Sequence, residues 1–242
     1  DALLSNTTGT NNVALGRRSL ANNTTAGQNV GVGASSLVTN TTGARNTAVG
    51  YHALEASTTA TNNVAVGNEA LTANTTGIEG VAVGDRSLSN NTTGNKNNGM
   101  GHFSLNANTE GNSNTGIGHD CLKSNTTGDD NTAVGAFALD ANTTGEYNVA
   151  MGYGALSANT TANGNTAIGR RALLDNTTGA SNTAIGRQAL EDNTTASNNT
   201  AVGYNSLYLN TTGTQNVAVG AFALDANTTA NDNTAIGYVA LS

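Results

Sequence analysis

The sequence predicts an all-β fold, a β-solenoid of about 14 coils with 17 residues in each coil. Three observations predict it. The tetrapeptide Asn-Thr-Thr-Gly, or a close variant of it, recurs 14 times along the chain. Every interval between copies is 17 residues, without insertion or deletion. Glycine and leucine keep fixed places in the repeat. A constant period of this kind is typical of chains whose repeats stack as equivalent units.

We number the repeat from 1 to 17, so that Asn40 is position 1 of one repeat and Ser57 is position 1 of the next. Position 2 is Thr, position 11 is Gly and position 15 is Leu in all 14 copies. In an α-helix, residues at this spacing lie about 4.7 turns apart, so the leucines would not share a face. In a β-solenoid they lie about 4.8 Å apart in one column along the axis. The fixed positions therefore indicate a solenoid.

Each part of the coil follows from the residue types. Positions 7 to 10, such as residues 46–49, are predicted to form a short strand, with positions 8 and 10 facing the core and position 9 facing the opposite side. Glycine at position 11 permits a sharp corner. Positions 12 to 15 are predicted to form a second short strand that ends at the leucine. The remaining positions are expected to form a turn, in which Asn and Thr side chains hydrogen-bond locally and between coils.

These assignments define two groups of residues. The predicted structural core consists of the apolar residues at positions 10 and 15, among them Val49, Leu54, Val66, Leu71, Val83, Leu88, Val134, Leu139, Ile168, Leu173, Ile185, Leu190, Val219 and Leu224. The predicted turn and ladder residues are those at positions 1, 2 and 11, among them Asn40, Thr41, Gly50, Asn74, Thr75, Gly84, Asn142, Thr143 and Gly152. Residues 1–242 are expected to form a single repetitive domain. Because both ends fall within a repeat, we expect this domain to be a segment of a longer fibre.

The composition excludes several classes of function. Only 10% of the residues are charged and 4% are aromatic, and the net charge is −7. No basic cluster is present, so nucleic-acid binding is not expected. No apolar run approaches the roughly 18 residues of a membrane span, so membrane insertion is not expected either. The sequence contains no nucleophile elbow, phosphate loop or paired carboxylates in a fixed frame. We therefore expect no enzyme activity and no cofactor.

The thin core predicts self-association. Each coil offers about three sizeable apolar side chains, whose burial contributes about 5–9 kcal/mol. Ordering a coil of this length costs on the order of 25 kcal/mol. Ladder hydrogen bonds recover part of the difference, and a second buried face recovers more. We therefore expect the coils to pack against copies of the same chain, with a lone solenoid and an open filament as the alternatives.

Residues 46–51 (Asn-Thr-Ala-Val-Gly-Tyr), 165–169 (Asn-Thr-Ala-Ile-Gly) and 216–220 (Asn-Val-Ala-Val-Gly) resemble two related patterns. One is the left-handed β-roll of YadA-like trimeric autotransporter heads. The other is the repeat array upstream of intramolecular chaperone domains in phage tail fibres and related bacterial surface proteins. The resemblance covers the whole chain. It implies a parallel trimer in an extracellular fibre, on a cell surface or a virion, with Val49, Ile168 and Val219 directed into the core.

The expected function is thus a non-catalytic structural segment of a trimeric fibre whose partners are copies of itself. One alternative is a segment that binds a host-surface glycan or receptor, for which tyrosine at position 12 and phenylalanine at position 13 would supply stacking surfaces. A further alternative is ice binding through the threonines at positions 2 and 3. Adjacent threonines face opposite sides of a strand, however, which disfavours a single flat threonine surface.

Two histidines are the only candidates for metal ligands. His102 and His119 both occupy position 12 in consecutive repeats, so they are expected to stack, with Asp85, Asp120 and Cys121 nearby. Exposed, neutral histidines in a variable column are the simpler interpretation. The sequence therefore predicts no metal site, with His102 and His119 as the residues to inspect.

Overall fold

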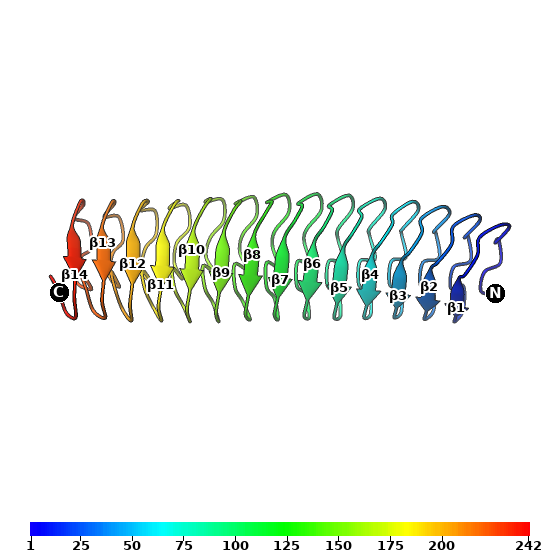
Figure 1. Ribbon diagram of the computed structural model, residues 1–242, viewed down its shortest axis with the longest axis horizontal. Helices are drawn as coiled ribbons and strands as arrows, with labels where there is room; N and C mark the ends of the chain where they lie inside the picture. The colour runs from blue at the N-terminus through cyan, green and yellow to red at the C-terminus, as the bar shows by residue number, and fades with distance from the viewer. The chain divides into compact units, whose positions relative to one another are not determined.

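The computed structural model describes residues 1–242, which divide into two compact units, Asp1–Asp120 and Cys121–Ser242. Each unit contains seven strands of three residues and no helix (Figure 1). Every strand occupies positions 8 to 10 of its repeat. The prediction of one continuous domain stays a prediction.

The strands follow one another at the period of the repeat. In the first unit they are β1 (Val13–Leu15), β2 (Val30–Val32), β3 (Thr47–Val49), β4 (Val64–Val66), β5 (Val81–Val83), β6 (Asn98–Met100) and β7 (Thr115–Ile117). In the second unit they are β8 (Thr132–Val134), β9 (Val149–Met151), β10 (Thr166–Ile168), β11 (Thr183–Ile185), β12 (Thr200–Val202), β13 (Val217–Val219) and β14 (Thr234–Ile236).

Within each unit the strands form a parallel sheet in chain order, and each residue lies opposite its equivalent in the next repeat. Val13 pairs with Val30 in the first unit, and Thr166 pairs with Thr183 in the second. The chain makes one turn per 17 residues, because each strand pairs with the strand of the following repeat. The predicted all-β solenoid with 17 residues per coil is confirmed.

The leucine at position 15 fills the interior of each coil. Leu54 and Leu88 in the first unit, and Leu139 and Leu173 in the second, have no exposed surface. Neighbouring coils are joined beside these side chains, since the Leu88 amide donates to the Ser104 carbonyl at 2.9 Å. Burying a leucine contributes about 1.5–3 kcal/mol, so the column supplies most of the apolar stabilisation in each coil.

The predicted direction of the strand is wrong. Position 9 points inward, where its Ala is fully buried in most coils, and positions 8 and 10 point outward. The position 10 residues of the predicted core are therefore half-buried or exposed: Val49, Val66, Val83, Val134, Ile168, Ile185 and Val219. The exposed fractions of Val66, Val83 and Ile185 are 36%, 38% and 37%. The reason is space, because a Cβ at Gly31 in the position 9 column would lie 2.5 Å from Ser19 Oγ and 3.4 Å from Leu20 Cγ.

Positions 12 to 15 do not form the predicted second strand. The backbone instead has a positive φ at positions 13 and 15, for example 55° at His52 and 51° at Leu54. These turns still bond to neighbouring coils, because the Leu54 amide donates to the Ala70 carbonyl at 3.0 Å. A non-glycine residue in this region costs about 1–2 kcal/mol. Burial of the leucine and the coil-to-coil hydrogen bond offset that cost.

Two asparagine columns line the rest of the interior. At position 1, Asn40 Nδ2 donates to Asn23 Oδ1 at 2.8 Å and to the Gly43 carbonyl at 2.9 Å. Asn142 makes the equivalent bonds in the second unit. At position 7, the Asn46 backbone amide donates to the Asn29 side-chain oxygen Oδ1 at 2.9 Å. These side chains are buried, so their hydrogen bonds avoid the cost of unpaired polar groups.

The threonine at position 2 adds a third polar column. Thr41 donates its backbone amide and its hydroxyl to the Thr58 carbonyl, at 3.0 and 3.1 Å. The hydroxyls of Thr75 and Thr143 donate to the carbonyls of Thr92 and Thr160 in the same way. These half-buried hydroxyls are bonded to the neighbouring coil, whereas the threonines at position 3 are exposed.

Glycine at position 11 allows neighbouring backbones to approach closely. Gly50, Gly84 and Gly152 have φ values of 146°, 134° and 134°. A Cβ at Gly50 would lie 2.1 Å from the Gly67 carbonyl oxygen. Both the backbone conformation and the approach of the next coil therefore require glycine.

We predict that Gly169→Ala lowers the free energy of unfolding by about 3 kcal/mol or more, because the new Cβ would lie 2.4 Å from the Gly186 carbonyl oxygen. Gly154→Ala is the control. Gly154 also has a positive φ, but its nearest neighbour is a Leu174 side-chain carbon at 3.4 Å. The control should lose only about 1–2 kcal/mol. Denaturant unfolding of both variants measures the difference, and equal losses would contradict the steric explanation.

A second prediction concerns Ser57, which replaces asparagine at position 1 and leaves Asn40 Oδ1 and its own Oγ buried without a hydrogen-bond partner. Ser57→Asn restores a donor to Asn40 and an acceptor for Asn74. We expect the free energy of unfolding to rise by about 1–3 kcal/mol. Ser157→Asn, at a half-buried position outside the column, is the control and should change little. An unchanged or lower unfolding midpoint for Ser57→Asn would contradict the role of the ladder.

Candidate functional site

The candidate sites of this protein are surfaces, because neither unit contains a pocket. Four surface features stand out in the two units. They are the outward side of the strands, a column of aromatic rings, an ion-pair cluster in the second unit and a histidine cluster in the first.

The outward side of the strands, here called the outer strand face, consists of positions 8 and 10 of every repeat. In the first unit the position 10 residues Val66, Val83, Met100 and Ile117 are all exposed. Position 8 carries Val or Thr beside them, with Asn98 as the exception. In the second unit Met151, Ile185 and Ile236 are exposed in the same way. Each unit thus presents an apolar row at position 10 beside an uncharged row of Val and Thr at position 8, and successive residues within a row lie about 4.8 Å apart.

No charged side chain interrupts the outer strand face. The 9 Lys and Arg and the 16 Asp and Glu residues all lie at other positions of the repeat. They concentrate at positions 3, 5, 6, 12, 13, 16 and 17, where the chain is turning. The surface is therefore divided into an uncharged strand side and charged turns.

Aromatic rings at positions 12 and 13 form small stacks in the second unit. Tyr204 and Phe222 pack edge to face with ring centroids 5.1 Å apart, and Phe222 and Tyr238 do so at 6.2 Å. The Arg187 guanidinium lies 5.4 Å from the centroid of the Tyr204 ring. These rings were the predicted stacking surfaces for a glycan. The two tyrosines are exposed and Phe222 is half-buried, and the rings pack against each other along the column.

An ion-pair cluster at positions 13, 16 and 17 of the second unit was missed by sequence reasoning. Arg171 Nη2 lies 2.6 Å from Glu191 Oε1, and the Glu191 side chain is almost fully buried. Glu191 Oε2 is buried without a hydrogen-bond partner. The pKa of the neighbouring Asp192 is raised by burial and by the negative charge of Asp175, against the opposing effect of Arg171. The pKa of Tyr208 is raised as well, chiefly by Glu191.

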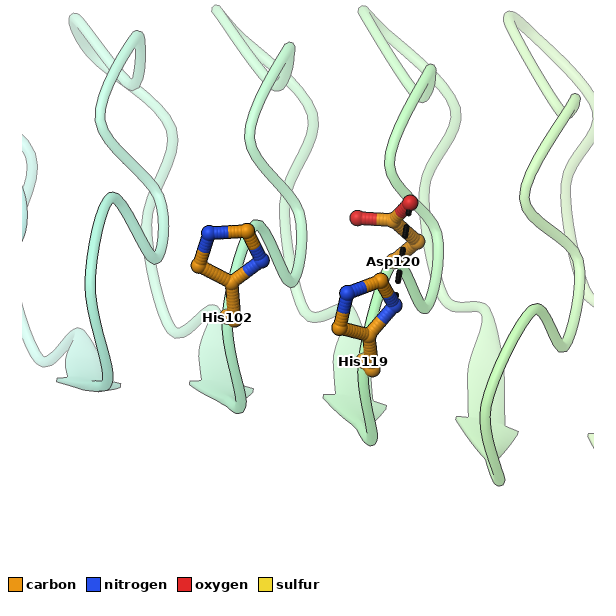
Figure 2. A group of neighbouring side chains, drawn as sticks. All are labelled: His102, His119 and Asp120. Carbon is orange, nitrogen blue, oxygen red and sulfur yellow. Dashed lines mark ion pairs between the residues drawn. The ribbon is translucent and has the colours of Figure 1, made fainter.

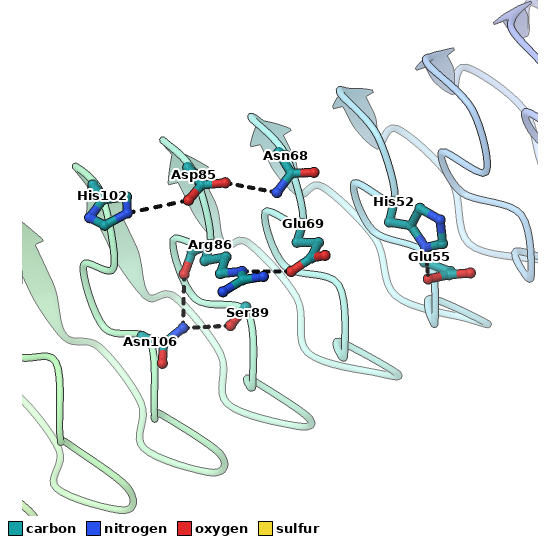
Figure 3. Close-up of polar contacts among 9 residues, drawn as sticks. All are labelled: His52, Glu55, Asn68, Glu69, Asp85, Arg86, Ser89, His102 and Asn106. Carbon is teal, nitrogen blue, oxygen red and sulfur yellow. Dashed lines mark hydrogen bonds and ion pairs between the residues drawn. The ribbon is translucent and has the colours of Figure 1, made fainter.

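The first unit contains a line of polar contacts across consecutive coils (Figure 3). Asn68 Nδ2 donates to Asp85 Oδ1 at 2.7 Å, and Asp85 Oδ2 lies 3.3 Å from His102 Nε2. Beside this line, Arg86 Nε donates to Glu69 Oε2 at 2.8 Å. Asn106, which Figure 3 also shows, donates to the Ser89 hydroxyl at 2.6 Å and to the Arg86 carbonyl at 3.2 Å.

His102 and His119 stack as their shared column predicts. Their ring centroids lie 5.1 Å apart with 26° between the planes. His119 Nδ1 lies 3.7 Å from Asp120 Oδ2, so the two rings and this carboxylate form one cluster (Figure 2). Cys121, expected nearby, has a buried side chain whose Sγ donates to the Ala133 carbonyl within the second unit. The remaining histidine, His52, pairs through Nδ1 with Glu55 Oε2.

A pH-dependent prediction follows from Asp192. Its pKa is raised above 3.8, so the folded chain holds this proton at pH values where the unfolded chain has lost it. The stability contribution of Asp192 therefore falls as the pH rises through this window. Asp192→Asn should raise the unfolding midpoint at pH 7 and give no gain below pH 3.8.

Thermal unfolding between pH 3 and pH 8 provides the measurement. Asp225→Asn controls for the change of side chain itself and should show a smaller gain at neutral pH. A gain for Asp192→Asn that is independent of pH would contradict the electrostatic origin.

Comparison with known proteins identified no relative of this chain. The chain matched no protein-family model, no curated protein and no solved structure. The structure contains no helix long and apolar enough to cross a membrane. The resemblance to YadA-like heads and tail-fibre repeats stays a prediction that rests on the residues of the repeat.

Proposed function

We propose that this chain is a structural segment of an extracellular fibre, in which copies of the chain pack against one another through the outer strand face. One observation carries the proposal. The outer strand face is a regular, uncharged surface in each unit, with exposed Val, Ile and Met side chains at position 10 and half-buried Val and Thr side chains beside them at position 8. Contiguous apolar surface of this kind marks an association site in a soluble protein.

The interior of the coil supports the same proposal. The inward side of the strand carries only Ala or Gly, and one Leu per coil supplies the large apolar side chain. The larger apolar residues at position 10 are therefore only partly buried within the chain, with exposed fractions of 36% at Val66 and 43% at Met100. Covering these side chains in an assembly stabilises it by about 25 cal/mol for each Å² of apolar surface removed from water. Association would thus bury the position 10 side chains that a single chain leaves partly exposed.

The distribution of charge determines which surface can be buried between copies of the chain. Charged residues lie at the turns and not on the outer strand face, so the strand sides can meet without burying any of them. A buried unpaired charge costs several kcal/mol, and the outer strand face contains none. Three copies around a common axis is the stoichiometry implied by the families that the repeat resembles. An extracellular location, on a virion or a cell surface, and a role without catalysis belong to the same proposal.

The decisive measurement is the mass of the chain in solution, by sedimentation or by light scattering. The assembly should have three times the 24.1 kDa of one chain. Val66→Lys combined with Val83→Lys should reduce this mass to that of one chain. Both side chains are exposed in the single chain, so the coils can fold, whereas a buried lysine opposes assembly.

Thr59→Lys combined with Thr76→Lys is the matched control. These threonines are exposed at position 3 of the same two repeats and lie away from the outer strand face. The control should keep the trimer. A wild-type chain that sediments as a monomer would contradict the proposal, and so would equal dissociation of both variants.

A further inference from the structure

We infer that His102, His119 and Asp120 form a binding site for a divalent transition-metal ion of the zinc class. The site lies wholly in the first unit, at positions 12 and 13 of two consecutive coils. It is separate from the outer strand face and from the structural role proposed above.

The three side chains already converge. Their ligand atoms all lie within 4.8 Å of one another. Zinc binds imidazole nitrogen at about 2.0–2.1 Å, so two ligands at the tetrahedral angle lie about 3.3 Å apart. The 3.7 Å between His119 Nδ1 and Asp120 Oδ2 is close to this separation. The histidine side chains are 44% and 51% exposed, so their rings can rotate to close the remaining distance.

The neighbouring coil orients His102. Asp85 Oδ2 lies 3.3 Å from His102 Nε2, and Asp85 in turn accepts a hydrogen bond from Asn68. A proton on Nε2 leaves Nδ1 as the nitrogen with a lone pair for an ion. Metal-binding histidines commonly have such a carboxylate partner, which fixes the tautomer and increases the basicity of the ligand. The contact between Asp85 and His102 therefore prepares the ring for coordination.

The backbone holds the two coils at a constant separation. The Asp120 amide donates to the His102 carbonyl at 3.0 Å, which joins the two coils that carry the ligands. The Phe103 amide donates to the Asp85 carbonyl at 3.1 Å, which joins the His102 coil to the preceding one. The Cα atoms that carry the ligands thus belong to the coil-to-coil ladder. Only the side chains must move when an ion binds, which limits the entropy lost.

The ligand set selects the class of ion. Two imidazoles and one carboxylate suit zinc, nickel, cobalt or copper, whereas calcium and magnesium prefer oxygen ligands. Three protein ligands leave a fourth position for water. An ion at this place would also join two coils by bonds that the polypeptide lacks.

Calorimetric titration of the complete chain with zinc chloride tests the inference. We expect one zinc ion per chain and at least a tenfold loss of affinity in His119→Ala. His52→Ala is the matched control, because His52 also lies beside a carboxylate in the first unit, but in a separate pair with Glu55. The control should stay within twofold of the wild type.

Titration with cobalt(II) gives an independent readout. The wild-type chain should develop the visible absorption of four-coordinate cobalt, and His119→Ala should not. Zinc should raise the thermal midpoint of the wild type and leave that of His119→Ala unchanged. No stoichiometric binding in the wild type, or an equal loss of affinity in His52→Ala and His119→Ala, would overturn the inference.

Discussion

The hydrogen bond between successive coils is the interaction on which the rest of this structure depends. Strand residues, turn residues, asparagine amides and threonine hydroxyls all bond to a neighbour one repeat away. A single inserted residue would shift every later column out of register. This constraint explains why the period of the sequence is constant. It also explains why the coils can form with few large apolar residues. The backbone and the buried amides are paired along the axis, and this pairing stabilises coils that contain few large apolar side chains.

The sequence predicted the period, the solenoid and the burial of the leucine column, because each depends on a position that never varies. It did not predict the direction of the strand. Alternation separates position 9 from positions 8 and 10 but does not say which side faces inward. Size decides, since position 9 faces Ser19 and Leu20 in a narrow interior that admits only Ala or Gly. The invariant small residue was therefore the usable signal, and hydrophobicity was misleading.

The backbone conformation of positions 12 to 15 could not be predicted from the sequence either. Positive φ values are uncommon for residues other than glycine, so no local preference points to the value of 51° at Leu54. They arise because the leucine must enter the core while its amide reaches the next coil. Among the candidate sites, the stacking of His102 and His119 followed from their shared column. The burial of Glu191 against Arg171 did not, because three positions separate these residues within the repeat and the turn geometry was unknown.

The asparagine column at position 1 has a polarity, since each side-chain amide donates toward the preceding coil. Chains of hydrogen bonds strengthen one another when they run uninterrupted. In the first unit this column is broken at Ser57, and the column at position 7 is broken one coil later, at Gly80. Tension along the stacking axis would load all columns together, and the coil pairs that lack these rungs would separate first. The two departures from the repeat, Ser57 and Gly80, therefore place the mechanically weakest coils of the first unit near β4 and β5.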